Sequence, residues 1–229
     1  MRWLMALPHA ALLAAAGSLG YAQDRYPVRP VRVIVPYTPG GANDIFARLV
    51  LTRAVSEMGQ TTIVDNRPGG NTTIGTQLAA RATPDGYTLL NVDNAYTIGP
   101  SIQHSLPYDT LKDFVRITQY ATTSPVLVVH PSLPVKTVKD LLVLAKAQPG
   151  KLNYGSTGGG TTGHLAFAQI RMVTGLDAVH VLYKGGAPQI TALIAGEISM
   201  IISVPAPLDR KSTRLNSSHV SESRMPSSA

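Results

Sequence analysis

The chain has 229 residues, of which 44% are hydrophobic, and a formal charge of +7. That hydrophobic fraction supports one compact domain or two small lobes with a buried core, which excludes a disordered chain. Cysteine is absent, so disulfide bonds, thiolate catalysis and cysteine-ligated metals are excluded. The positive charges are scattered without a basic run. We therefore expect no nucleic-acid partner and a modest positive field that suits small anionic ligands.

The first 22 residues have the pattern of a secretory signal peptide. Arg2 precedes the apolar stretch 12–19, and small residues, Gly20 and Ala22, stand before the expected cleavage site. The alternative is a buried N-terminal helix, which the short apolar stretch and the turn-rich residues 24–27 disfavour. No other segment approaches the roughly 20 apolar residues of a membrane span. We expect export to the periplasm and a mature chain that begins after the signal peptide.

A strand, a glycine turn and a helix follow one another early in the mature chain. Residues 31–35 contain a β-branched run, which predicts a buried strand. Gly40 and Gly41 form the turn, and residues 42–58 predict a helix. Its apolar side is expected to carry Ile45, Leu49 and Val55. This order directs unpaired N–H groups and the positive end of the helix dipole at one place, which suits a carboxylate or phosphate.

The first half of the chain continues this alternation. We expect a strand at 61–65, a helix at 73–82 and a strand at 87–92. Residues 94–121 contain Pro100, Pro107 and a polar middle, so we interpret them as a crossover with at most a short helix near 111–114. Strands and helices that alternate with short connections predict a mostly parallel sheet covered by helices.

Alternation restarts after residue 123, which indicates a second lobe. The expected strands lie at 124–129, 152–156, 178–183 and 198–203, and the expected helices at 138–147, 162–173 and 188–195. Thr137 and Asp140 have the spacing of a capping box, and Pro188 suits the first position of the last helix. The predicted fold class is α/β, with two lobes, mostly parallel sheets and helices on both faces of each sheet.

Three glycine turns each follow a predicted strand and lead into a helix. Because ligands of open α/β sheets bind at the carboxyl ends of strands, these turns predict one shared binding rim. The candidate glycines are Gly40, Gly41, Gly158, Gly159, Gly160 and Gly185. Near them, Tyr37 and Thr38 offer hydroxyl groups and Asn94 offers an amide, although each of these residues equally suits a turn.

Two further rim residues have both a structural and a functional interpretation. Asp44, in the first turn of a helix, stabilises the helix dipole by roughly 0.3–1 kcal/mol without a ligand. Alternatively, it accepts a hydrogen bond from a ligand amino or hydroxyl group or repels over-charged anions. His164 lies in the first turn of a later helix, where it suits a ligand carboxylate or a structural role equally. The histidines lack helical metal spacing, so no metal site is expected.

Gly158, Gly160 and Gly163 match G-x-G-x-x-G between a strand and a helix, the context of a dinucleotide site. However, the acidic residue that should bind the ribose is missing from the end of the next strand, where Tyr183 and Lys184 stand. A dinucleotide-dependent oxidoreductase built on 158–163 is therefore the alternative function. The sequence has neither a nucleophile elbow nor a Walker A motif, so we expect no catalysis and no cofactor.

The character of the chain changes at residue 209. Residues 209–219 correspond to the translation of a common sequencing-adaptor sequence, and residues 223–229 to its continuation. We expect the tail 209–229 to be non-native and the natural protein to continue past Leu208.

Motifs from residue 26 to 208 resemble the Bug-type extracytoplasmic solute receptors of the tripartite tricarboxylate transporter family. They are Tyr26-Pro27, 30–36, Pro39-Gly40-Gly41 with Asp44, 65–70, 84–89, Gly155-Ser156 with Gly158 and Gly160, His164-Leu165, and Tyr183-Lys184-Gly185. The resemblance implies a periplasmic binding protein, not an enzyme, whose two α/β lobes close on a small carboxylate. It also implies delivery of that ligand to membrane permease subunits.

In the family, turns matching 38–41 and 157–162 hold the ligand, partly through water. That assigns Thr161 and Thr162 to the site with the glycines beside them. At these two positions the sequence also departs from the family pattern, which is expected to alter the floor of the pocket. Asn71 is another departure, because the family usually has small residues there. Family members continue beyond residue 208. Lobe 1, at 23–103, is therefore expected to lack its returning segment and lobe 2, at 104–208, its last elements. We expect a monomer.

Overall fold

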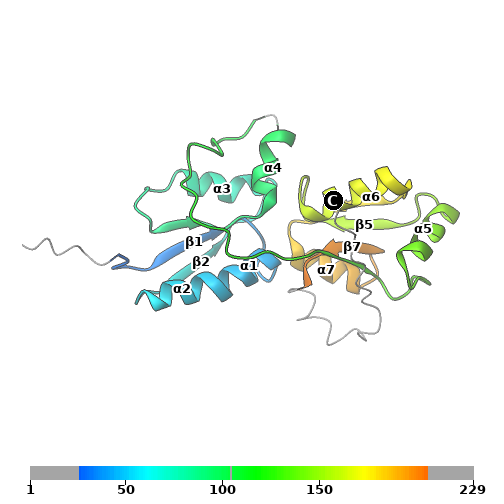
Figure 1. The fold of residues 1–229 in the computed structure, drawn as a ribbon, viewed down its shortest axis with the longest axis horizontal. Helices are drawn as coiled ribbons and strands as arrows, with labels where there is room; N and C mark the ends of the chain where they lie inside the picture. The colour runs from blue at the N-terminus through cyan, green and yellow to red at the C-terminus, as the bar shows by residue number, and fades with distance from the viewer. Residues whose placement is uncertain (1–25, 104, 206–229) are drawn as a thin grey trace, which may run out of the picture.

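The computed structural model describes residues 26–103 and 105–205, which form two β-sheets that lie side by side along the long axis of the molecule (Figure 1). The expected signal peptide and the tail 209–229 lie outside the described residues. Within the described ranges, no helix combines the length and the apolar character needed to cross a membrane. The two-lobed α/β fold expected from the sequence is confirmed.

Lobe 1 is built on a three-stranded parallel sheet. Its strands are β1 (Val31–Val35), β2 (Thr62–Asn66) and β3 (Thr88–Leu90), in the order β2-β1-β3. Figure 1 shows α3 (Thr73–Ala80) on one face and the helical run from α1 (Ala42–Phe46) to α2 (Thr52–Glu57) on the other. Because β1 is central, its β-branched side chains are buried from both faces.

The first helical run contains a π-helical stretch, η1 (Ala47–Leu51), between α1 and α2. The predicted apolar side is correct for Ile45 and Val55, which are buried, but wrong for Leu49, which is 61% exposed. A π-helical stretch turns less per residue than an α-helix, so a 3.6-residue period does not hold across it. Ala47 faces the core instead, where it contacts the cluster formed by the β1 side chains.

The region after β3 corrects the expected crossover, because it begins with a helix, α4 (Asn94–Ile102). Asp93 caps this helix through a 2.9 Å hydrogen bond from the Ala95 amide, and Pro100 lies in its last turn. The short helix expected near 111–114 is a turn instead. Asp109 Oδ1 accepts hydrogen bonds from the amides of Leu111 and Lys112, which satisfies these groups without a helix.

Lobe 2 is built on a mixed four-stranded sheet. Its strands are β4 (Val126–Val129), β5 (Asn153–Ser156), β6 (Val179–Leu182) and β7 (Met200–Ser203), in the order β4-β7-β5-β6. β7 runs parallel to β5 and antiparallel to β4. The helices are α5 (Val138–Ala147), α6 (Thr162–Thr174) and α7 (Gly186–Ile194). The capping box of Thr137 and Asp140 is confirmed at the start of α5, whereas α7 begins two residues before Pro188.

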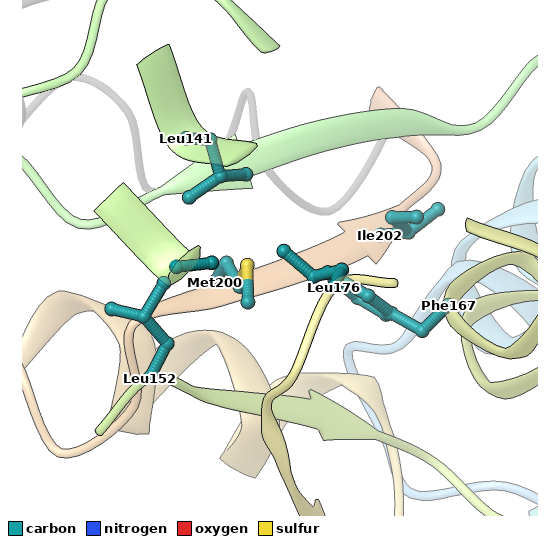
Figure 2. Close-up of a cluster of buried hydrophobic side chains, with 7 residues drawn as sticks. Leu141, Leu152, Phe167, Leu176, Met200 and Ile202 are labelled. Carbon is teal, nitrogen blue, oxygen red and sulfur yellow. The ribbon is translucent and has the colours of Figure 1, made fainter. Parts of the chain in front are cut away.

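The core of lobe 2 lies on both faces of its sheet. Side chains of β7 alternate, so Met200 and Ile202 point to one face and Ile201 to the other. Figure 2 shows Met200 and Ile202 among Leu141, Leu152, Phe167 and Leu176, a cluster that α5 and α6 cover. Ile201 packs instead against the helix α7. The sheet is therefore fixed from both sides, and the turns that follow its strands are held by a rigid base.

Candidate functional site

The turn after β1 lies directly against the turn after β6 of the other lobe. Thr38 Oγ1 approaches Gly185 so closely that a side chain at Gly185 would overlap it. One residue further along the second turn, the Gly186 amide nitrogen would lie 3.6 Å from a Cβ on Gly41. Thr38 Oγ1 is buried and has no hydrogen-bond partner among the described residues. The predicted rim residues Thr38, Gly41 and Gly185 are therefore brought together.

The turn after β5 meets a different part of lobe 1. The carbonyl oxygen of Gly159 accepts a 2.8 Å hydrogen bond from Asn71 Nδ2, and Thr162 Oγ1 donates a 3.1 Å hydrogen bond to Asn94 Oδ1. Gly160 faces α4, where an added Cβ would lie 2.6 Å from Ile102 Cδ1. All three predicted glycine turns therefore contact the opposite lobe at the junction between them.

Beneath the rim, lobe 1 holds a network of polar side chains. Tyr37 donates a 2.5 Å hydrogen bond to Asp93 Oδ1, and Asn43 Nδ2 donates to Oδ2 of the same carboxyl group. Burial and the neighbouring Asp93 raise the pKa of Tyr37 well above its usual value, so its phenol keeps its proton. Asn91 links this network to Tyr120, because its amide donates to the Asn43 carbonyl and its Oδ1 accepts a 2.6 Å hydrogen bond from Tyr120. Tyr37 thus holds the turn after β1 in place through a hydrogen bond within lobe 1.

Asp44 lies behind the first turn and is only 4% exposed. Its carboxylate accepts hydrogen bonds from the Gly40 amide, Arg48 Nε and Asn66 Nδ2, at 2.8, 3.0 and 3.0 Å. Burial acts to raise its pKa, but the hydrogen bonds from Arg48, Gly40 and Asn66 outweigh it and lower the pKa of Asp44. The amide of Gly40 is therefore engaged within lobe 1, and the geometry supports the structural interpretation of Asp44.

Ser156 and two histidine side chains of lobe 2 support the glycine turn after β5. Ser156 Oγ lies 2.6 Å from His180 Nε2 and also accepts a 3.3 Å hydrogen bond from the Gly158 amide. The ring of His164 lies 5.1 Å from that of His180, and His164 Nδ1 accepts a hydrogen bond from the Gly160 amide. Partial burial and the neighbouring His164 lower the pKa of His180. His164 is thus placed at the turn it was predicted to serve, and its Nδ1 binds the protein itself.

Of the described helices that begin at this junction, only α4 starts with a side-chain cap. No side-chain hydrogen bond caps α1, α3, α6 or α7, whereas Asp93 caps α4 and Thr137 caps α5. The first N–H groups of a helix have no partner inside the helix, and they carry a partial positive charge. Helix starts without a side-chain cap therefore gather at the junction, an arrangement that favours an anion.

Three residues at the junction were not predicted from the sequence as parts of the site. In the sequence Asn71 stands only as a departure from the family pattern, and the predicted site includes neither Asp93 nor Asn43. Asp93 carried a usable signal, since an Asp that closes a strand just before a helix is a common N-cap. Asn71 carried none, because its partner Gly159 lies 88 residues away.

The geometry favours neither a metal site nor a dinucleotide site among the described residues. Among the described residues, no group of His, Asp and Glu is arranged to hold a metal ion. Asn71 lies over Gly158, and Ile98 and Ile102 lie over Gly160, so lobe 1 occupies the space through which a dinucleotide would approach these glycines.

The sequence and the fold both match known receptors. The family described as tripartite tricarboxylate transporter family receptor (TctC) matches residues 46–220. A UPF0065 protein of Bordetella pertussis is 38% identical over 193 residues, which cover 83% of this chain and 58% of that protein. Protein BugT of the same organism is 33% identical over 201 residues, which cover 86% and 62% respectively. The structure of R. palustris Rpa4515 with adipate superposes with a TM-score of 0.78 at 34% identity, over 81% of this chain and 64% of that one.

The chain thus spans about three fifths of the length of these relatives. The resemblance to Bug-type receptors drawn from the sequence motifs is confirmed. The family match also extends past residue 208, into the segment expected to be a non-native tail. By sequence and by fold, the chain belongs to the receptor family of the tripartite tricarboxylate transporters.

Proposed function

We propose that this protein is an extracytoplasmic receptor that binds a small carboxylate between its lobes. The observation that carries this proposal is the meeting of the uncapped helix starts of α1, α6 and α7 at the junction, beside the unpartnered Thr38 Oγ1. Buried polar atoms without a protein partner often mark the place of a ligand or water. Rpa4515, solved with adipate, supports a carboxylate as the ligand class.

The finer parts of the proposal come from the family. The ligand is a dicarboxylate, a tricarboxylate, an amino acid or a related organic acid, bound in the periplasm by a monomeric receptor. The receptor then delivers it to the membrane permease subunits of a tripartite tricarboxylate-type transporter. Each hydrogen bond to an anion contributes roughly 1.5–3 kcal/mol, so about three or four suffice for micromolar binding after entropic losses. No bond of the ligand needs to be broken.

Calorimetric titration of the full chain tests this function. Adipate, citrate and NAD are titrated separately, and we expect at least one of the two organic acids to bind and be recovered unchanged. Thr38→Val keeps the shape of the side chain but removes its hydroxyl group, so it should weaken this binding. Thr174→Val makes the same change at the far end of α6, where the hydroxyl bonds Ile170 and Leu176 of the same lobe, and should have no effect on affinity. Binding of NAD in place of both acids would instead support the dinucleotide-dependent enzyme.

A further inference from the structure

Asn71, on the loop between β2 and α3, reaches from lobe 1 to the glycine turn of lobe 2. Its Nδ2 donates a 2.8 Å hydrogen bond to the carbonyl oxygen of Gly159. Its Oδ1 is buried against Gly158, where an added side chain would overlap it, and has no hydrogen-bond partner in the described part of the chain. One amide group therefore contacts two successive residues of the turn that is proposed to hold the ligand.

The backbone of this loop is held in an unusual conformation. Asn71 has a φ of 52° and Thr72 a φ of 75°, and they are the only non-glycine residues with positive φ in the ranges 26–103 and 105–205. Asn tolerates this left-handed region better than most residues, whereas Thr does not. Strained backbone of this kind persists only where surrounding contacts fix it, and it clusters at functional sites. The loop thus fixes the Asn71 side chain in the direction of lobe 2.

We propose that Asn71 is a clasp that holds the two lobes closed and so sets the affinity for the ligand. The role is one of positioning, since the amide acts through the glycine turn. The apparent affinity of a protein that binds in one conformation falls with the fraction of molecules in that conformation. The effect on affinity rests on the proposed receptor function, whereas the effect on closure does not.

The donor N–H of Asn71 is the group on which the clasp depends, and two variants remove it differently. Asn71→Asp keeps the size and the tolerance of positive φ but replaces the donor with an acceptor that faces the Gly159 carbonyl. Asn71→Gly fits the backbone without strain and removes both polar atoms. Thr73→Val is the matched control, because it removes a neighbouring 3.0 Å hydrogen bond to Gln103 that stays within lobe 1.

Closure can be measured without any ligand, because the chain has no cysteine of its own. Spin labels at Arg53→Cys on α2 and Met172→Cys on α6, both at exposed positions, report the distance between the lobes. We expect one narrow distance distribution for the parent and for Thr73→Val. Both Asn71 variants should give a broader distribution shifted away from it. If both Asn71 variants keep the parent distribution, Asn71 does not hold the lobes closed, even if the melting temperatures of the variants fall.

Adipate titration of the same variants gives the second readout. A lost hydrogen bond of this kind should weaken binding by about two- to tenfold, through faster release, in both Asn71 variants and not in Thr73→Val. Equal affinity in the parent and both Asn71 variants would contradict a role in binding. If the parent binds no organic acid, the proposed receptor function fails, and the distance measurement alone still decides whether Asn71 closes the lobes.

Discussion

The hydroxyl group of Tyr37 donates a 2.5 Å hydrogen bond to Oδ1 of Asp93, which also accepts from the amide of Ala95. This one carboxylate oxygen therefore joins the turn after β1 to the start of α4. The turn carries Thr38, and α4 carries Asn94, which contacts lobe 2. Two of the lobe 1 segments that meet the other lobe are thus fixed to a common carboxyl group, and the Asn71 loop is a third such segment.

We predict that Tyr37→Phe destabilises the protein by about 1 kcal/mol, the contribution of a typical hydrogen bond, because the ring stays in place and only the donor is lost. Urea denaturation monitored by circular dichroism measures the change. Tyr26→Phe is the matched control, since its 2.6 Å hydrogen bond to the Gly86 carbonyl is exposed and should matter less. Equal losses for the two variants would show that burial of the Tyr37 network has no special effect.

Gly185→Ala should abolish or strongly weaken ligand binding, because the new methyl group would overlap Thr38 Oγ1. The backbone itself would tolerate alanine, since the φ of Gly185 is 168° and lies in the extended region. Adding Thr38→Gly should therefore restore closure of the lobes. Gly186→Ala, with 3.5 Å to the nearest atom of lobe 1, should close normally. Distances between spin labels at Arg53→Cys and Met172→Cys measure the closure of the lobes in all of these variants. Unchanged closure in Gly185→Ala would refute the predicted overlap.

Asp44→Asn should destabilise the protein by roughly 1.5–3 kcal/mol for two reasons. The neutral amide weakens the charge-assisted hydrogen bond from Arg48, and its nitrogen atom cannot accept the hydrogen bond that the Gly40 amide donates to Asp44 Oδ2. The wild-type contribution also depends on pH. Because the folded-state pKa of Asp44 is lowered, its stabilisation is present above the unfolded-state pKa and is lost as pH falls through the folded value. Urea midpoints measured from pH 7 to pH 3 should therefore fall less steeply in Asp44→Asn than in the wild type.

His180 predicts a second pH dependence at milder acidity. Its pKa is lowered in the folded protein, so the unfolded chain takes up the proton first. Stability is therefore expected to fall as pH drops below the ordinary histidine pKa of about 6.5, down to the lower folded value. His180→Gln should flatten the stability curve in this window. A variant with the wild-type slope between pH 7 and pH 5.5 would rule out His180 as its source.

Most of the fold was predictable because most strands are short runs of β-branched or other apolar residues and most helices have clear ends. The helix α4 was missed because Pro100 and Pro107 suggested irregular structure, yet Pro100 lies only in the last turn of a helix that Asp93 caps at its start. The position of Leu49 was missed because hydrophobic periodicity assumes a uniform helix. Both errors come from treating local patterns as regular.

The candidate site was predictable as far as it depends on strand ends. The glycine turns at Gly41, Gly159 and Gly185 do meet the opposite lobe, as the rule for open α/β sheets implies. The roles of individual side chains were not predictable, because they depend on which partners the fold brings to them. Asp44 accepts a hydrogen bond from the Gly40 amide four residues earlier, whereas Asn71 donates one to Gly159 of lobe 2.

The π-helical stretch at residues 47–51 makes the first helical run tolerant of one change in chain length. Such stretches accommodate one additional residue within an otherwise regular helix. Deleting a single residue there should therefore restore a uniform α-helix and leave Val55 buried. Deleting a residue from α2 instead should rotate everything after it by roughly 100°. Homologues that lack one residue in 47–51 should therefore keep the same apolar pattern on either side of it.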